Sequence, residues 1–239
     1  MSATSARRAV ASREDARPRR QRADAERNRR ALLDAAVQVF GERGLEATVA
    51  EIAARAGVGQ GTAFRHFPTK EELIAATVRD MLDRITATAL EQLHEPDPLL
   101  ALRTLLHSGS QLMVSNQGFK SATANSLVHE HPDVSAASEQ LLQVAAQLLA
   151  RAQDAGVIRA DITPEDIPVL LCAVSATDIA PREQSPALWE RYFEIVFSGI
   201  CTGVGATPPA TLAASAPTPE ELRQFKASLP PGDAADDAV

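Results

Sequence analysis

The chain has 239 residues, of which 45% are hydrophobic, 23% are charged and 4% are aromatic. This composition is typical of a globular protein, and the low aromatic content favours helices over strands. The net charge of −7 hides an asymmetry, because residues 1–70 carry 14 Lys and Arg against 8 Asp and Glu, whereas residues 71–239 carry 10 against 23. A basic end on an acidic remainder indicates that this end meets a polyanion.

Several functional classes find no support in the sequence. No apolar stretch approaches the roughly 18–20 residues of a membrane span, and the Arg-rich N-terminus lacks the apolar segment of a secretory signal. We therefore expect a cytoplasmic protein with no membrane partner. His129 and His131 do not share a helix face, and no nucleophile–base pair is found, so we expect no metal, no cofactor and no enzymatic activity. Cys172 and Cys201 lie in apolar helical patterns and are expected to be buried free thiols.

The first segment, residues 1–24, holds seven arginines and no run of large apolar residues. We expect a disordered basic arm. Two interpretations of this arm stay open: a solvated tail, or an arm that follows DNA phosphates or the minor groove.

Residues 25–70 predict three helices. The first runs from about Asp24 to Arg43 and ends near two glycines. The second begins at Thr48, which has the spacing of a capping box with Glu51. Gly57 falls in the following turn, where a positive φ is needed. The third helix spans roughly residues 60–67, before Pro68. Two short helices joined by a tight turn can place the second in the DNA major groove.

Residues 71–203 predict a larger helical domain. Thr69 and Glu72 form a second capping box, which opens a long helix at 70–94. Further helices are expected to begin at Pro98, Pro132, Thr163 and Ser185, each with a polar cap or a proline in its first turn, and residues 118–128 form a broken segment. No alternating run typical of a strand is present, so the chain is expected to be all-α. Residues 204–239 are rich in Pro and Ala and are expected to form a loose tail.

One stretch resembles the signature of the TetR/AcrR family of bacterial one-component repressors. Its matching residues are Thr48, Ile52, Ala53, Ala56, Gly57, Val58, Gly61, Thr62, Arg65, His66, Phe67, Lys70, Glu71 and Leu73, preceded by Leu33, Ala35, Ala36, Phe40 and Gly44. The later helices resemble the family only in number and length. The resemblance implies an N-terminal three-helix helix-turn-helix DNA-binding domain and a C-terminal helical ligand-binding and dimerisation domain.

The resemblance also implies which residues contact DNA: Thr48, Gln60, Gly61, Thr62, Phe64, Arg65, His66 and Lys70. Gln60 suits a paired hydrogen bond to adenine, and Thr48 caps a helix whose amides would face a phosphate. The family often has Tyr at the position of Phe64, so a phosphate hydrogen bond is lost here. Ala50 stands where some members carry an Arg that reads guanine. Core packing of Phe64, and plain surface roles for His66 and Lys70, stay open.

The helices after Pro98 exceed what a small DNA-binding unit needs. By resemblance, the last two large helices pair with their copies in a dimer, through Leu170, Leu171, Val174, Trp189, Tyr192, Phe193 and Val196. A small-molecule pocket is expected among the preceding helices, with residues 116–125 as a candidate gate. Its candidate lining residues are His107, Met113, Phe119, His129 and Cys172, each of which could instead be core or surface.

Together these expectations describe a ligand-responsive transcriptional repressor. It would bind a near-palindromic operator as a homodimer and be released by a small-molecule effector that tilts the helix at 70–94. A DNA-binding activator is the alternative, because repression and activation differ by operator position. A helical enzyme is disfavoured because no nucleophile–base or metal constellation is found. A partner-binding protein is disfavoured because it does not need a basic end on an acidic body.

Overall fold

The computed structural model describes residues 3–123, 128, 130–175, 188–203 and 220. Its helices are α1 (Ala3–Arg43), η1 (Gly44–Glu46), α2 (Val49–Arg55), α3 (Gln60–His66), α4 (Lys70–Gln92), α5 (Pro98–Ser115), α6 (Gln117–Thr123), α8 (Pro132–Asp154), α9 (Asp166–Ser175) and α10 (Leu188–Ile200). In this part of the chain, β-type pairing is limited to one bridge between Ile158 and Cys201. The expectation of an all-α fold is confirmed.

None of the described helices combines the length and hydrophobicity that a bilayer crossing requires.

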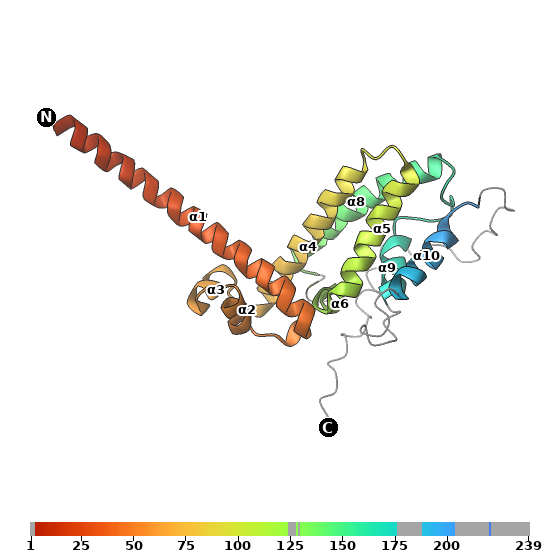
Figure 1. Cartoon of the computed structure of the whole chain (residues 1–239), viewed down its shortest axis with the longest axis horizontal. Helices are drawn as coiled ribbons and strands as arrows, with labels where there is room; N and C mark the ends of the chain where they lie inside the picture. Colours follow the sequence, from red (N-terminus) through yellow and green to blue (C-terminus); the bar gives the residue numbers. More distant parts are fainter. Residues whose placement is uncertain (1–2, 124–127, 129, 176–187, 204–219, 221–239) are drawn as a thin grey trace, which may run out of the picture.

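Helix α1 is much longer than expected. It begins at Ala3 rather than at Asp24, so the segment that the sequence analysis assigned to a disordered arm is helical from Ala3 onward. Ala and Arg are frequent in that segment and are strong helix formers, and the segment continues directly into the packed half of α1. Figure 1 shows the N-terminal half of α1 projecting away from the rest of the molecule.

The end that the sequence predicts to bind DNA is a small unit in which α1, α2 and α3 pack together beside the start of α4 (Figure 1). Leu32, Leu33 and Ile52 are almost fully buried at its centre. The apolar stripe predicted on α1 supplies part of this core, as helical spacing requires.

The C-terminal body is a bundle in which α4 packs along α8, and α5 packs against α8 and α9 (Figure 1). Helix α10 covers α5 and α9 on the outside. Leu102, Leu148 and Phe197 belong to the second apolar cluster, which fills this bundle.

The two regions are not separated by a break in the core. The first apolar cluster runs from α1–α3 through α4 to Met113 of α5, Phe119 of α6 and Val134 of α8. The boundary expected near residue 70 is therefore bridged by shared packing. A displacement in the C-terminal body can reach the DNA-binding unit through close-packed side chains.

Most helices begin at the predicted capping residues and first-turn prolines, with small differences in position. Asp97 and His131 cap α5 and α8, each with a proline in the first turn, as expected. Helix α9 begins at Asp166, whose carboxylate accepts from the Thr163 N–H at 2.8 Å, so the predicted start was early. The segment expected to be broken contains helix α6. The predicted start at Ser185 and nearly all of the tail at 204–239 lie outside the described residues.

Candidate nucleic-acid interface

Helix α2 is held by its ends. Thr48 and Glu51 form the predicted capping box: the Glu51 N–H donates to Thr48 Oγ1 at 3.3 Å, and the Thr48 N–H donates to Glu51 Oε2 at 2.8 Å. Arg43 donates to the other Glu51 oxygen at 2.5 Å. The Thr48 backbone N–H, followed by the Thr48 hydroxyl and Arg43, holds the pKa of Glu51 below its ordinary value.

At the far end of α2, the Arg55 guanidinium donates to both carboxylate oxygens of Glu42, at 2.9 and 3.2 Å. This paired hydrogen bond lowers the pKa of Glu42 and raises that of Arg55. Both groups are exposed, so their contribution to stability is small. Their effect is geometric: α2 is tied at each end to the last turn of α1.

The turn between α2 and α3 depends on Gly57. Its φ is +66°, in the left-handed region, as the sequence predicts. The Val58 N–H reaches back to the Ala53 carbonyl at 3.0 Å, and Val58 packs against the first cluster. This turn fixes where α3 begins.

Helix α3 buries one side and presents the other. Ala63 is 1% exposed and faces the core, whereas Gln60, Gly61 and Arg65 are exposed, and Phe64 is 43% exposed. Core packing of Phe64, left open above, is excluded by this exposure. The outer face of α3 therefore carries short and polar side chains at the helix start, with the Phe64 ring beside them. Such a surface fits a DNA major groove.

The remaining predicted contacts flank this face. Thr62 and His66 are half-buried on α3, and the exposed Thr48 stands at the start of α2. Lys70 is the first residue of α4. The Thr69 hydroxyl caps this helix by accepting from the Glu72 N–H at 3.1 Å, which is one of the two hydrogen bonds of the predicted capping box. A cation in the first turn of a helix opposes the helix dipole, which favours an anion opposite Lys70.

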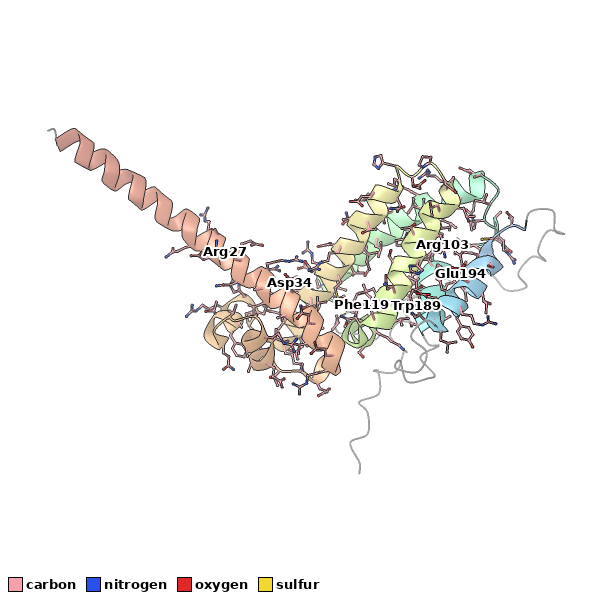
Figure 2. All side chains as sticks on the ribbon, in the orientation of Figure 1. Arg27, Asp34, Arg103, Phe119, Trp189 and Glu194 are labelled. Carbon is pink, nitrogen blue, oxygen red and sulfur yellow. The ribbon has the colours of Figure 1, made fainter. Side chains whose placement is uncertain are left out.

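Charged side chains lock α1 to α4 behind the interface. Arg30 of α1 contacts Asp80 of α4 at 2.7 Å, and Arg84 of α4 contacts Asp34 of α1 at 2.7 Å. The ring closes within each helix, between Arg30 and Asp34 and between Arg84 and Asp80. Figure 2 labels Asp34 on α1. The ring links the DNA-binding unit to the long helix that leads to the C-terminal body.

The predicted ligand-pocket residues that the structure describes lie in two places. His107 of α5 packs against Trp189 and Phe193 of α10, with ring centroids 5.0 and 5.1 Å apart. Met113 and Phe119 are buried in the first cluster, and Cys172 is half-buried beside it. His129 lies outside the described residues.

Neither cysteine is fully buried, in contrast to the expectation. Both are half-buried, and the Cys201 thiol donates to the Phe197 carbonyl at 3.3 Å. Burial, with a smaller effect of Glu194, raises the pKa of the Cys201 thiol, which makes it a weak nucleophile.

The predicted dimer residues divide into two groups. Val174 and Phe193 are only 2% and 3% exposed within one chain, which leaves them little surface for a partner. The other members are half-buried: Leu170, Leu171, Trp189, Tyr192 and Val196. Ile195 of α10 is 53% exposed and was not among the predicted dimer residues. A large apolar residue on the outer side of a helix is a signal that could have identified it. Arg103 of α5 and Glu194 of α10 form an ion pair at the edge of this face (Figure 2).

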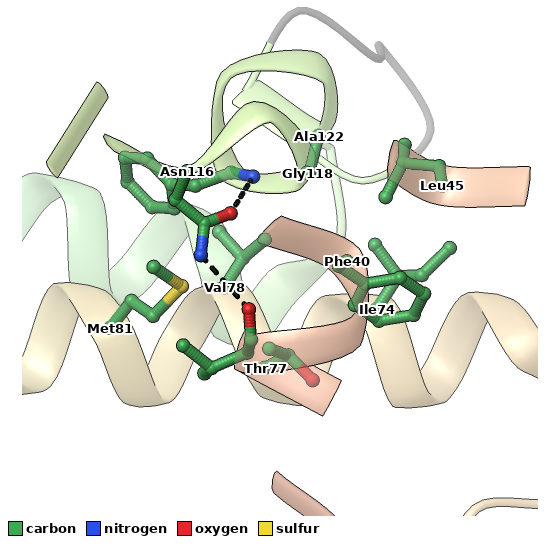
Figure 3. Close-up of a pocket in the computed structure, with 11 residues that line it drawn as sticks. Phe40, Leu45, Ile74, Thr77, Val78, Met81, Asn116, Gly118 and Ala122 are labelled. Carbon is green, nitrogen blue, oxygen red and sulfur yellow. Dashed lines mark hydrogen bonds between the residues drawn. The ribbon is translucent and has the colours of Figure 1, made fainter. Parts of the chain in front are cut away.

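A cavity lies where the two regions meet (Figure 3). Its volume is about 10 Å³, close to the room that one water molecule needs. Phe119 is the predicted pocket residue that lines it. The other lining residues come from α1, η1, α4 and α6: Val37, Phe40, Leu45, Ile74, Thr77, Val78, Met81, Asn116, Gly118 and Ala122. Sequence reasoning missed the roles of Asn116 and Gly118, because their contacts are with residues far away in the chain.

Two helices crossing at a glycine turn, with a polar outer face on the second, define a helix-turn-helix DNA-binding protein. Residues 32–77 match the family described as bacterial regulatory proteins of the tetR family. Residues 97–202 match the C-terminal domain described as transcriptional regulator SbtR-like.

The solved structures that this chain resembles extend the match to most of its length. A TetR transcriptional regulator from Streptomyces coelicolor is 34% identical, with a TM-score of 0.57, over 76% of this chain and 99% of that one. A TetR transcription regulatory protein from Mycobacterium vanbaalenii is 32% identical, with a TM-score of 0.56 and the same coverage. The chain belongs to the TetR family. This confirms the resemblance, the DNA-binding and transcription-regulating class and, because the family is non-enzymatic, the expectation that the chain is not an enzyme.

Other relatives match less of the chain or only its fold. The regulator BetI of Rhizobium meliloti is 43% identical over 63 residues, 26% of this chain and 31% of that protein. The match thus spans about a third of the length of that relative. The regulator FadR of Bacillus subtilis, solved in complex with stearoyl-CoA, is 19% identical, with a TM-score of 0.53 over 71% of this chain and 98% of that one; this shows the fold alone.

Proposed function

We propose that this regulator is a ligand-responsive repressor that binds a near-palindromic operator as a homodimer. The observation that carries the proposal is the outer face of α3, where Gln60, Gly61 and Arg65 are exposed at the start and end of a helix whose opposite side is core. Gln60 would read a base, and Gly61 would let the helix backbone approach the base edges. Thr62, Phe64 and His66 complete the contacts to bases and backbone.

Phosphate contacts would position this face. Lys70 and Thr48 lie at the N-terminal ends of α4 and α2, where helix dipoles favour anions. The charge asymmetry between residues 1–70 and the rest supports the same orientation. Because its target is chromosomal DNA, we place the protein in the cytoplasm.

Dimerisation would use the outer surface of α9 and α10. Leu170, Trp189, Tyr192 and Val196 keep part of their apolar surface exposed, and Ile195 adds more. Pairing this surface with its copy would bury it and set two α3 helices about one DNA turn apart.

An effector site in the C-terminal body is supported by Ser110 of α5. Its side chain is 0% exposed, and its hydroxyl has no hydrogen-bond partner among the described residues. Ser110 lies between Leu106 of the second cluster and Met113 of the first, so it marks the seam between the two. An apolar molecule with one polar atom would satisfy the hydroxyl there. The FadR complex indicates that this fold can hold a small molecule.

Release would follow from movement of α4. An effector that displaces α5 or α8 would tilt α4 and strain the ring of Arg30, Asp34, Asp80 and Arg84. A coupling free energy of about 1–3 kcal/mol changes affinity roughly 5–150-fold.

The test is to select duplexes from a random pool with the purified full chain at low ionic strength, and then to footprint the selected sequence. Two protected half-sites about one helical turn apart are expected. Protection of one unrepeated half-site by a monomer would contradict the dimer, and failure to select any duplex would contradict the proposal as a whole.

A further inference from the structure

The corner between α5 and α6 is a point where the C-terminal body touches the DNA-binding unit. Asn116 forms this corner and is 7% exposed. Its N–H donates to the Leu112 carbonyl of α5 at 3.0 Å, and its carbonyl accepts from the Lys120 N–H of α6 at 3.1 Å. One buried residue therefore ends one helix and begins the next.

The Asn116 side chain adds a third connection (Figure 3). Its Oδ1 accepts from the Phe119 N–H at 2.8 Å, which is an N-cap of α6, while its Nδ2 donates to the Val37 carbonyl of α1 at 3.0 Å. The donor and the acceptor of the amide thus serve different partners, so the group satisfies both in one orientation only. Rotating it by half a turn would place two oxygens against each other at Val37.

Two glycines let α6 and α1 approach closely at this corner. A Cβ on Gly118 would lie 2.4 Å from the Phe40 Cβ and 2.6 Å from the Phe40 carbonyl oxygen. A Cβ on Gly41 would lie 3.1 Å from Asn116 Nδ2. Helix α6 is therefore seated directly on the last turns of α1, immediately before η1 and α2.

A small cavity of about 10 Å³ lies on the other side of the same contact. Asn116 lines it from the corner, Phe119 lines it from α6, and Ile74 and Met81 line it from α4. Phe119 packs in one apolar cluster with Ile74 and Met81. The corner is thus joined to α1 by directed hydrogen bonds and close glycine contacts, and it meets α4 mainly through apolar side chains.

We propose that Asn116 is a positioning residue that couples the α5–α6 corner to α1 and so sets the position of α1–α3 relative to the C-terminal body. This coupling is a route separate from the tilt of α4, because it bypasses that helix. It rests on the proposed function in one respect: operator DNA is its readout. A dimer must place two α3 helices on two half-sites together, so freedom at the corner weakens binding to the full operator and spares binding to a single half-site.

Asn116→Asp isolates this coupling. It keeps the size of the side chain and an acceptor for the Phe119 N–H, but replaces the donor to Val37 with an oxygen that the Val37 carbonyl repels. Ser115→Asp is the matched control, because Ser115 is the exposed neighbour at the same corner and adds the same charge. Binding is measured on the selected full operator and on a duplex with one half-site, together with the unfolding midpoint and amide hydrogen exchange.

The expected result is that Asn116→Asp binds the full operator about tenfold more weakly, within the range typical of coupled sites, and binds the half-site as the wild type does. Amides of α2 and the last turns of α1 exchange faster, and those of α8 do not change. Ser115→Asp behaves as the wild type. Wild-type operator affinity in a folded Asn116→Asp protein overturns the proposal, as does an equal loss on the full site and the half-site, which reports damage to the DNA-binding unit itself.

If Asn116→Asp fails to fold, Asn116→Ser answers the same question. The serine hydroxyl can still cap α6, but it is too short to reach Val37, and it adds no charge. Should the wild type bind no duplex, the proposed function fails, yet the exchange experiment still decides the coupling: faster exchange confined to α1 and α2 supports it, and unchanged exchange overturns it.

Discussion

The stretch from α2 to the start of α4 and the body from α5 to α10 consist of similar helices, but their geometry has different origins. In the first, short-range chemistry decides each boundary, through the box of Thr48 and Glu51, the turn at Gly57 and the cap at Thr69. In the second, caps such as Asp97 and His131 also set helix starts, but apolar side chains far apart in the chain decide how the helices pack. The recognition surface can therefore be read residue by residue, whereas the site that controls it depends on which helices meet.

The largest effect is expected from removing core side chains in each region. Ile52→Ala and Leu148→Ala each create a cavity at a 0% exposed position and should lower the free energy of unfolding by about 2–5 kcal/mol. Because the first cluster bridges both regions, urea unfolding should be a single transition in both variants. The single tryptophan, Trp189, reports on the body by fluorescence, and circular dichroism reports on all helices. If Ile52→Ala lowers the urea midpoint measured by circular dichroism but leaves the midpoint measured by Trp189 fluorescence at its wild-type value, the two regions unfold as independent units.

The next effect separates reading from positioning within the interface. Gln60→Ala should relax the preference for one base by about 1–3 kcal/mol. Lys70→Ala should weaken binding to every duplex and reduce the slope of log affinity against log salt by about 1. Competition binding with operator variants at several salt concentrations measures both. If Gln60→Ala keeps the wild-type base preference, Gln60 is not one of the residues that recognise bases.

The turn allows a test of short-range control. Gly57→Ala should cost about 1–2 kcal/mol, because the backbone φ is +66° while no atom lies within 4 Å of the added Cβ. Gly59→Ala is the matched control two residues away, where φ is −62° and the added Cβ meets only the Thr62 hydroxyl, at 4.0 Å. Equal stability of the two variants in urea unfolding would mean that the turn does not depend on Gly57.

The sequence predicted the helix-turn-helix closely because its signals act over three to five residues. Hydrophobic patterning misled at the other end: the arginine-rich segment has no run of large apolar residues, yet it continues α1 to Ala3. The pocket candidates were chosen by residue type, but His107 pairs with Trp189 while Phe119 lies at the cavity near α1. The role of Asn116 follows from Val37, 79 residues away in the chain, and a single sequence carries no record of that pair.

The smallest expected effect bears on the proposed effector site. Ser110→Ala removes a buried hydroxyl that has no partner in the described part of the chain, so stability should stay equal or rise by about 1 kcal/mol. Ser108→Ala is the control on the same helix, because its hydroxyl donates to the Thr104 carbonyl at 2.8 Å and its loss should be slightly destabilising. Opposite signs in thermal unfolding would mark Ser110 as a polar group kept at a cost to stability, as a ligand-binding group is. A destabilised Ser110→Ala protein would instead mean that the hydroxyl already supports the fold, and the effector site would have to be sought elsewhere in the body.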